Sequence, residues 1–289
     1  MDKILEIYNL RKEFKGFTLD DISFSIPRGF IMGFIGPNGA GKTTTIKLIM
    51  NLLHRSGGDI KIFGMDNRDH EKKIKEKIGF VYDEVFYFDR LNARQVGFLM
   101  PRFYQSWDRT AFSRYLTEFD LPIGKKIKDF SRGMKLKLSL AVALSHAAEL
   151  VVMDEPTSGL DPIFRNELLR ILLGYIQDEN RSVLFSSHIT GDLEKIADYV
   201  TFINQGKIVF SENKDDVQRQ YSIVKGPKAD LTPGLESRLI GLNLAGFGFE
   251  GLCRNVAEIR MQLPGQAVVE TADLDQIMLF FAREARLDN

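Results

Sequence analysis

The chain has 289 residues, of which 44% are hydrophobic and 27% are charged, a composition typical of a globular protein with one large domain and a small one. Lys plus Arg and Asp plus Glu both total 39, so the zero net charge does not favour nucleic acid as the main partner. A single cysteine, Cys253, excludes an internal disulfide and favours a reducing compartment. The first residues are not expected to be a signal peptide, and the most apolar run, residues 138–153, is too short and too polar for a membrane span.

Two N-terminal segments, residues 4–10 and 17–26, alternate between apolar and polar side chains and predict half-exposed antiparallel strands. The polar residues 11–16 between them are expected to form a turn that contains Phe14. If its ring is free, Phe14 could stack on a nucleotide base, a contact worth about 1–3 kcal/mol. A ring folded back onto the core is the alternative, and the sequence favours neither.

A phosphate-binding loop follows. Residues 36–43 fit the pattern G-x-x-x-x-G-K-[ST] and lie between a strand-like apolar run at 30–35 and a helical run at 44–50. Glycines let the backbone N–H groups point inward at an anion, and the dipole of the next helix adds partial positive charge. We expect a triphosphate to bind Gly36, Pro37, Asn38, Gly39, Ala40, Gly41, Lys42, Thr43 and Thr44. Lys42 would reach the β and γ phosphates, and the Thr43 hydroxyl would ligate Mg²⁺. A glycine-rich turn with a chance lysine is the alternative.

The next segments continue the alternation of strands and helices. A short strand, a charged helix and a buried strand are expected at residues 57–64, 72–77 and 78–82. The last of these strands ends at Asp83, and a carboxylate there lies where doubly wound sheets bind ligands. Residues 91–128 carry aromatic side chains at helical spacing with little β pattern, which predicts a helical insertion.

Two later segments place polar groups where catalysis could use them. An apolar stripe at helical spacing follows Ser131, so we expect Ser131 to cap a helix and to form a second anion site with Gly133. A fully apolar strand then ends at Asp154 and Glu155, which resembles a Walker B motif. Asp154 would hold the hydration shell of Mg²⁺, and Glu155 would polarise the attacking water. Two ordinary surface charges are the alternative.

Over about residues 1–215 the chain resembles the ATP-binding subunits of ABC transporters, most closely the stand-alone subunits of bacterial exporters. The motifs that carry this resemblance are residues 36–44, 131–134, 153–156, 158–161 and 186–188. The resemblance implies ATP and Mg²⁺ as cofactors and a homodimer or heterodimer in which each ATP lies between one subunit's phosphate loop and the partner's Ser131 and Gly133. It also implies that His188 contacts the γ-phosphate and that Asp161 crosses the dimer interface.

The resemblance and the residues together predict that Lys42, Glu155 and His188 act in catalysis, with Glu155 as the base. Three positions depart from the family pattern. The signature usually reads Leu-Ser-Gly-Gly-Gln, whereas residues 130–134 read Phe-Ser-Arg-Gly-Met and keep the serine and the second glycine. The adenine-stacking tyrosine of the family corresponds to Phe14. The family's glutamine corresponds to Asp83, which is expected to reach Mg²⁺ through a water.

The predicted fold is α/β: a P-loop NTPase of the ABC type, with a RecA-like core, an antiparallel β subdomain and a helical subdomain at about 91–145. A hairpin is expected at 199–210, turning at Gln205 and Gly206, and a charged linking helix at 211–220. Further short strands and an amphipathic helix are predicted at residues 222–225, 266–270 and 273–281. Residues 1–220 would then form the ATP-binding domain. Residues 221–289 would form a small α+β accessory domain that is regulatory or supports the dimer, so a chain ending near Gln220 should still bind ATP.

The predicted function is ATP binding and hydrolysis that drives a separate membrane-spanning permease, with an exporter favoured. The subunit would lie in the cytoplasm, peripherally on the inner face of the cell membrane, and no nucleic acid partner is expected. The alternative is a soluble ABC ATPase that acts on nucleic acid or ribosomes. Such proteins carry long coiled coils, zinc-bearing insertions or a second nucleotide domain, which this sequence lacks. A small-molecule P-loop kinase is disfavoured by residues 131–134 and 158–161.

One loop is expected to receive the membrane subunit. Residues 85–88 read Val-Phe-Tyr-Phe directly after the acidic pair that ends the preceding strand. Four successive apolar or aromatic residues are costly to expose, and aromatic side chains are favoured at interface centres. The sequence therefore predicts a groove for a short cytoplasmic helix of the permease. The alternative is that these rings pack the helical insertion onto the sheet.

Overall fold

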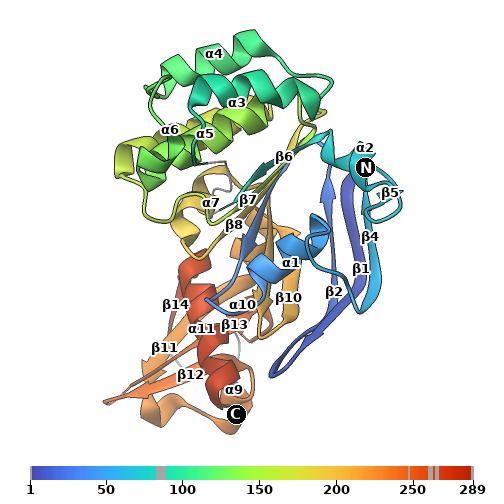
Figure 1. Cartoon of the computed structure of the whole chain (residues 1–289). Helices are drawn as coiled ribbons and strands as arrows, with labels where there is room; N and C mark the ends of the chain where they lie inside the picture. The colour runs from blue at the N-terminus through green and yellow to red at the C-terminus, as the bar shows by residue number, and fades with distance from the viewer. Residues whose placement is uncertain (1, 83–88, 247, 260–262, 264–266, 288–289) are drawn as a thin grey trace.

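In the computed structural model the described residues are 2–82, 89–246, 248–259, 263 and 267–287 (Figure 1). A sheet with strand order β10-β9-β3-β8-β7-β6 forms the centre. Its strands are β3 Ile31–Ile35, β6 Ile78–Val81, β7 Leu150–Asp154, β8 Ser182–Ser187, β9 Tyr199–Asn204 and β10 Lys207–Asn213. All neighbours pair in parallel except β10, which is antiparallel to β9. β3, β7 and β8 are buried along their whole length, as expected for parallel strands covered on both faces.

The antiparallel β subdomain has the strand order β2-β1-β4-β5 and packs beside helix α1 (Figure 1). Its elements are β1 Lys3–Phe14, β2 Phe17–Pro27, β4 Gly57–Ile62, β5 Met65–Asp66 and α1 Lys42–Ile49. The expected turn at 11–16 is wrong, because β1 continues to Phe14 and Glu13 pairs with Thr18 of β2. The polarity of this stretch reflects an exposed strand end. Only Lys15 and Gly16 form the turn, and Gly16 adopts a φ of +87°.

The helical insertion was predicted correctly and forms the upper part of Figure 1. Its elements are α3 Ala93–Leu99, a 3₁₀ turn Met100–Arg102, α4 Arg109–Glu118, a 3₁₀ turn Ile127–Asp129 and α5 Arg132–Leu144. The helices before and after it in the chain are α2 Glu71–Lys75 and α6 Pro162–Tyr175. Some of its aromatic rings, among them Phe112 and Phe119, are buried in the core that the subdomain shares with the central sheet. Others point outward: Phe98 and Phe103 are 67% and 65% exposed.

The C-terminal part forms a third sheet with the order β12-β13-β11-β14. Its elements and those leading to it are α7 Thr190–Ile196, α8 Lys214–Gln220, β11 Tyr221–Pro227, a 3₁₀ turn Lys228–Asp230, α9 Pro233–Glu236, β12 Leu239–Ala245, β13 Gly248–Arg254, α10 Val256–Ile259, β14 Val268–Thr271 and α11 Leu274–Leu287. The hairpin turn lies where it was expected, at Gln205 and Gly206, both with positive φ. The linking helix begins only at Lys214, because Ser211 still pairs with Thr201 of β9.

The C-terminal part shares the hydrophobic core of the ATP-binding part. The ring of Phe281 in α11 lies 5.7 Å from that of Phe202, 6.4 Å from that of Phe210 and 5.8 Å from that of Tyr221. Phe202 and Phe210 belong to the central sheet and are almost completely buried. The division at residue 220 stays a prediction, but the two parts are packed together. Among the described residues, no helix is long and apolar enough to cross a membrane.

This packing predicts that both parts unfold together. Replacing Phe281 by Ala should lower the free energy of unfolding by about 2–4 kcal/mol, because the rings around it lose their partner. Leu279→Ala on the same helix is the control: Leu279 is 50% exposed, and its truncation should change stability by about 0.5 kcal/mol or less. Calorimetry should show one transition, shifted as a whole by Phe281→Ala. Two transitions, of which only one moves, would contradict the shared core.

Candidate functional site

The loop between β3 and α1 can only be built with glycine at two positions. A Cβ on Gly36 would lie 2.3 Å from the carbonyl oxygen of Ile203, and one on Gly41 would lie 2.4 Å from the Leu19 side chain. Gly41 also has a φ of +115° and is the N-cap of α1. The first N–H groups of a helix have no intrahelical acceptor, so the start of α1 can bind an anion.

Lys42 lies at the centre of this loop. Its side chain is 6% exposed, and its Nζ donates to the carbonyl oxygens of Gly36 at 2.7 Å and Pro37 at 3.3 Å. The same Nζ lies 3.2 Å from Oε1 of Glu155. The loop lysine and the carboxylate after β7 therefore meet at one point.

Glu155 has an unusual backbone for a residue with a side chain. Its φ is +49°, a conformation that costs of order 1–3 kcal/mol and that is concentrated at functional sites. The Glu155 N–H donates to Oγ of Ser186 at 3.0 Å, which holds the strained turn. Its Oε2 accepts a hydrogen bond of 2.7 Å from Nδ1 of His188. Its Oε1 is buried and, within the described part of the chain, receives no hydrogen bond of good geometry.

Asp154 is the last residue of β7 and is 2% exposed. Its Oδ1 accepts a hydrogen bond of 2.7 Å from Ser186, and the Thr43 side chain also hydrogen-bonds to it. Burial raises the pKa of the Asp154 carboxyl, while the hydrogen bonds from Ser186 and Thr43 and the charge of Lys42 oppose that rise. A cation beside this carboxylate would offset the cost of its burial.

The donor set around Asp154 fits Mg²⁺. A threonine hydroxyl and one carboxylate are hard oxygen donors, and Mg²⁺ is commonly bound by one or two carboxylates together with substrate phosphates. Within the described ranges, no group of three or more His, Cys, Asp and Glu side chains is placed to hold a metal ion. Asp83, the third expected metal residue, lies outside the described residues.

A cavity of about 240 Å³ lies over the loop. It is lined by Phe17, Asn38, Gly39, Gly41, Lys42, Thr43, Thr44 and Glu155. Phe14 is absent from this lining. Its ring is 43% exposed, with Nζ of Lys12 at 5.3 Å and the ring of Phe17 at 6.5 Å. Of the two alternatives left open by the sequence, the structure shows the exposed ring.

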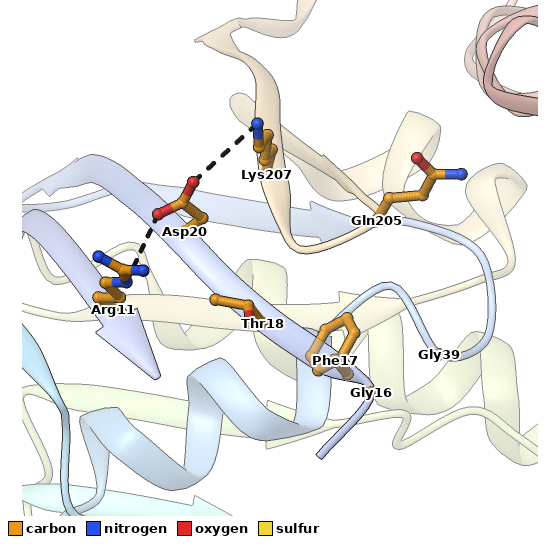
Figure 2. A pocket seen from close by; sticks show the side chains of 8 residues that line it. All are labelled: Arg11, Gly16, Phe17, Thr18, Asp20, Gly39, Gln205 and Lys207. Atoms are coloured by element: carbon orange, nitrogen blue, oxygen red, sulfur yellow. Dashed lines mark ion pairs between the residues drawn. The ribbon is translucent and has the colours of Figure 1, made fainter. Parts of the chain in front are cut away.

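A second cavity, of about 580 Å³, adjoins the first and is shown in Figure 2. Both cavities are lined by Phe17 and Gly39, so the second continues outward from the phosphate loop. Three of its lining residues form ion pairs: Oδ1 of Asp20 lies 3.8 Å from Nε of Arg11, and Oδ2 of Asp20 lies 4.0 Å from Nζ of Lys207. The two cavities together give room beyond the phosphates for the rest of a nucleotide.

Three expected site residues form a separate group. Ser131 caps α5 and accepts from the Met134 N–H at 3.2 Å, as predicted. Asp161 caps α6 and accepts from the N–H groups of residues 163 and 164. A Cβ on Gly133 would lie 3.9 Å from the Leu160 side chain, so the two caps belong to neighbouring segments. Ser131, Gly133 and Asp161 are not among the residues that line the loop cavity.

Two residues at the site were not found from the sequence. Phe17 lines both cavities, but the stacking role was predicted for Phe14. Ser186 contacts Asp154 at the end of β7 and Glu155 directly after it. It could be found only once β8 is known to pair with β7, where Asp154 lies opposite Ser186.

Comparisons with known proteins agree with this geometry. Residues 19–158 match the family model described as ABC transporter, and residues 126–191 also match a model described as AAA domain, putative AbiEii toxin, Type IV TA system. The bacitracin transport ATP-binding protein BcrA of Bacillus licheniformis is 34% identical over 194 residues, which cover 66% of this chain and 63% of that protein. The lantibiotic transport ATP-binding protein SrtF of Streptococcus pyogenes is 34% identical over 215 residues, covering 73% of this chain and 92% of that protein.

A solved structure described as the ATP binding subunit of an ABC transporter superposes with a TM-score of 0.67 at 27% identity, covering 75% of this chain and 92% of that one. The structure of cbiO1 from Clostridium perfringens, at 23% identity and a TM-score of 0.63, has the same fold. The loop, the paired acidic residues, the histidine and these relatives together show that the chain belongs to the family of ATP-binding, ATP-hydrolysing subunits of ABC transporters.

Proposed function

We propose that this chain hydrolyses ATP for an ABC exporter by acting on a separate membrane-spanning permease from the inner face of the cell membrane. The observation that carries the catalytic part is the position of Glu155, whose two carboxylate oxygens lie 3.2 Å from Nζ of Lys42 and 2.7 Å from Nδ1 of His188. A carboxylate, the lysine of the loop and a histidine thus meet at one point, and Lys42 and Glu155 also line the cavity over the loop.

The loop supplies binding and the end of β7 supplies the base. Phosphate oxygens are stronger acceptors for Lys42 than the two carbonyl oxygens that it contacts now, so a bound triphosphate would draw the ammonium away from Glu155. Oε1 of Glu155 is then free to accept a proton from the attacking water. Thr43 and Asp154 would hold Mg²⁺, which when bound neutralises charge on the β and γ phosphates.

His188 orients the carboxylate and can also contact the phosphate. The contact of Nδ1 with Oε2 of Glu155 requires Nδ1 to carry the proton. The other ring nitrogen, Nε2, can then donate to a γ-phosphate oxygen when the ring is protonated. His188 would therefore link the base to the γ-phosphate that the water attacks.

We propose a head-to-tail dimer for the second group of residues. Ser131 and Gly133 lie at the start of a long helix, a position that favours an anion, yet they do not line this subunit's own loop cavity. The arrangement is explained if they contact the ATP of a second ATP-binding subunit, identical or not. Asp161, on the neighbouring segment, would then lie at the same interface.

The groove for the permease is proposed between α2 and the helical subdomain. A cavity of about 920 Å³ lies there, and its lining combines apolar residues of α3, the 3₁₀ turn and α5 with charged residues of α2. Its lining includes Phe80, Leu91, Val96, Leu99, Met100, Phe103 and Tyr104. The loop at 85–88, where docking was expected, lies outside the described residues. A groove lined by both apolar and charged residues could bind a short amphipathic helix of the membrane subunit.

Glu155→Gln tests the base. The substitution keeps the shape of the side chain and removes its ability to take a proton, so kcat should fall by about 10²–10⁴-fold while ATP still binds. Steady-state ATPase assays and nucleotide-binding titrations would measure the two effects. Glu270→Gln, on the exposed strand β14, is the matched control and should hydrolyse ATP normally. Turnover near that of the unmodified protein in Glu155→Gln would refute the assignment.

Ser131→Arg tests the dimer. In the Glu155→Gln background, ATP should produce a dimer on size-exclusion chromatography, and the arginine should abolish it while the nucleotide affinity of the monomer barely changes. Loss of a helix cap alone costs about 1 kcal/mol, so Asp108→Ala, which removes the cap of α4 in the same subdomain, controls for stability. Loss of ATP binding by the Ser131→Arg monomer would show that Ser131 serves its own subunit's site.

Phe103→Ser tests the groove. Phe103 lines it and is 65% exposed, so the substitution should spare the fold and basal ATP hydrolysis but reduce co-purification with the membrane subunit. Phe98→Ser is a matched control, because Phe98 is 67% exposed in the same subdomain but lines a different cavity. Equal co-purification of the two variants would place the permease elsewhere.

A further inference from the structure

The C-terminal helix α11 begins against the segment that carries the catalytic histidine. Helix α7 starts at Thr190, two residues after His188. Oγ1 of Thr190 donates to Oδ1 of Asp275 in α11 at 3.1 Å. The N–H of Leu274 donates to Oε1 of Glu194 in α7 at 2.9 Å. Two hydrogen bonds, one donated by each helix, therefore join the first turn of α11 to α7.

The other end of α11 reaches the hairpin turn beside the phosphate loop. Nε2 of Gln205 donates to the carbonyl oxygen of Ala285 at 3.2 Å, and Nδ2 of Asn204 donates to that of Phe281 at 3.5 Å. In Figure 2, Gln205 extends to the side on which α11 appears, in the red of the C-terminus. The turn is itself bonded to the loop, because the Gly206 N–H donates to the carbonyl oxygen of Ala40 at 3.0 Å.

Helix α7 is also held from its other side. Asp192 is completely buried and accepts two hydrogen bonds, of 2.6 and 2.9 Å, from Nε of Arg165 in α6. Helix α6 begins at the Asp161 cap. The position of α7, and with it that of the residues just before it, is set by α6 on one side and by α11 on the other.

We propose that α11 positions His188 relative to the phosphate loop, with Thr190 and Asp275 as the positioning residues, so that the C-terminal part of the chain sets the rate of ATP hydrolysis. The proposal rests on the proposed function, in which His188 orients Glu155. Neither Thr190 nor Asp275 lines either of the cavities at the phosphate loop. They act only through the backbone that leads to His188.

The test is Thr190→Val, which has nearly the same shape as threonine but no hydroxyl. Thr190 is 3% exposed, so the hydrogen bond is lost with little change in packing. We expect kcat for ATP to fall about threefold to tenfold, the factor that one hydrogen bond typically carries, with KM for ATP unchanged. KM should not change, because ATP binding depends on the phosphate loop, and Thr190 does not line the cavity over that loop. Thr190→Ser keeps the hydroxyl and should therefore have the kcat of the unmodified protein. A purely structural role of Thr190 predicts no fall of kcat at constant KM in Thr190→Val.

Asp275→Ala completes a double-mutant cycle. Because the two side chains share one hydrogen bond, the double variant should lose no more activity than either single variant. Leu279→Ala on the exposed face of α11 is the control and should keep kcat. Melting temperatures would show whether each variant is folded.

The outcomes separate the two proposals. If the unmodified protein hydrolyses ATP and folded Thr190→Val and Asp275→Ala keep its kcat, or if their losses add, the positioning role is refuted and the proposed function stands. If Thr190→Ser fails to restore kcat, the hydroxyl is not the group responsible, and the positioning role is equally refuted. If the unmodified protein does not hydrolyse ATP at all, the proposed function itself fails.

Discussion

The register of three parallel strands decides where each of the proposed catalytic groups lies. Ile35 of β3 pairs with Ser187 of β8, and Ser186 of β8 pairs with Asp154 of β7, so the three strands end at one edge of the sheet. Side chains alternate along a strand, and a shift of one residue would turn Asp154 away from Ser186. The phosphate loop, the acidic pair and the histidine come from distant parts of the sequence, and this common edge is what brings them together. Burial of these strands on both faces makes any other register costly.

Within that frame, Glu155 is held where it is needed by interactions that a nucleotide can replace. Its strained backbone is stabilised by Ser186, and its carboxylate is shared between Lys42 and His188. Each partner is a group that a triphosphate also attracts. The contacts with Lys42 and His188 stabilise the buried charge of Glu155, and we expect both to weaken when ATP binds. In the proposed mechanism a carboxylate held in this way keeps its orientation, and it becomes free to accept a proton from the attacking water only when a triphosphate is bound.

Contiguous motifs could be predicted from the sequence, and contacts made by folding could not. The loop from Gly36 to Thr44 and the acidic pair Asp154 and Glu155 could be predicted because the residues of each motif are adjacent in the sequence. The caps at Ser131 and the hairpin turn at Gln205 follow from local rules of helices and turns. Phe17 was missed because base stacking was predicted for Phe14, and nothing local says which of the two rings faces the phosphate loop. The amphipathic pattern of α11 was visible, but nothing local says that Phe281 packs on Phe202 of the central sheet. The roles of Asp83 and of residues 85–88 remain predictions.

The shared core explains why the C-terminal part can influence the site. Helix α7 has only seven residues, and so short a helix is not stable by itself in water. Its place depends on tertiary contacts: buried Leu193 and Ile196, the pair of Asp192 with Arg165, and the bonds to α11. The strands beneath it are fixed by ladders on both sides. A displacement of α11 would therefore move α7 before it moves the sheet. His188 lies two residues before α7 and would move with it.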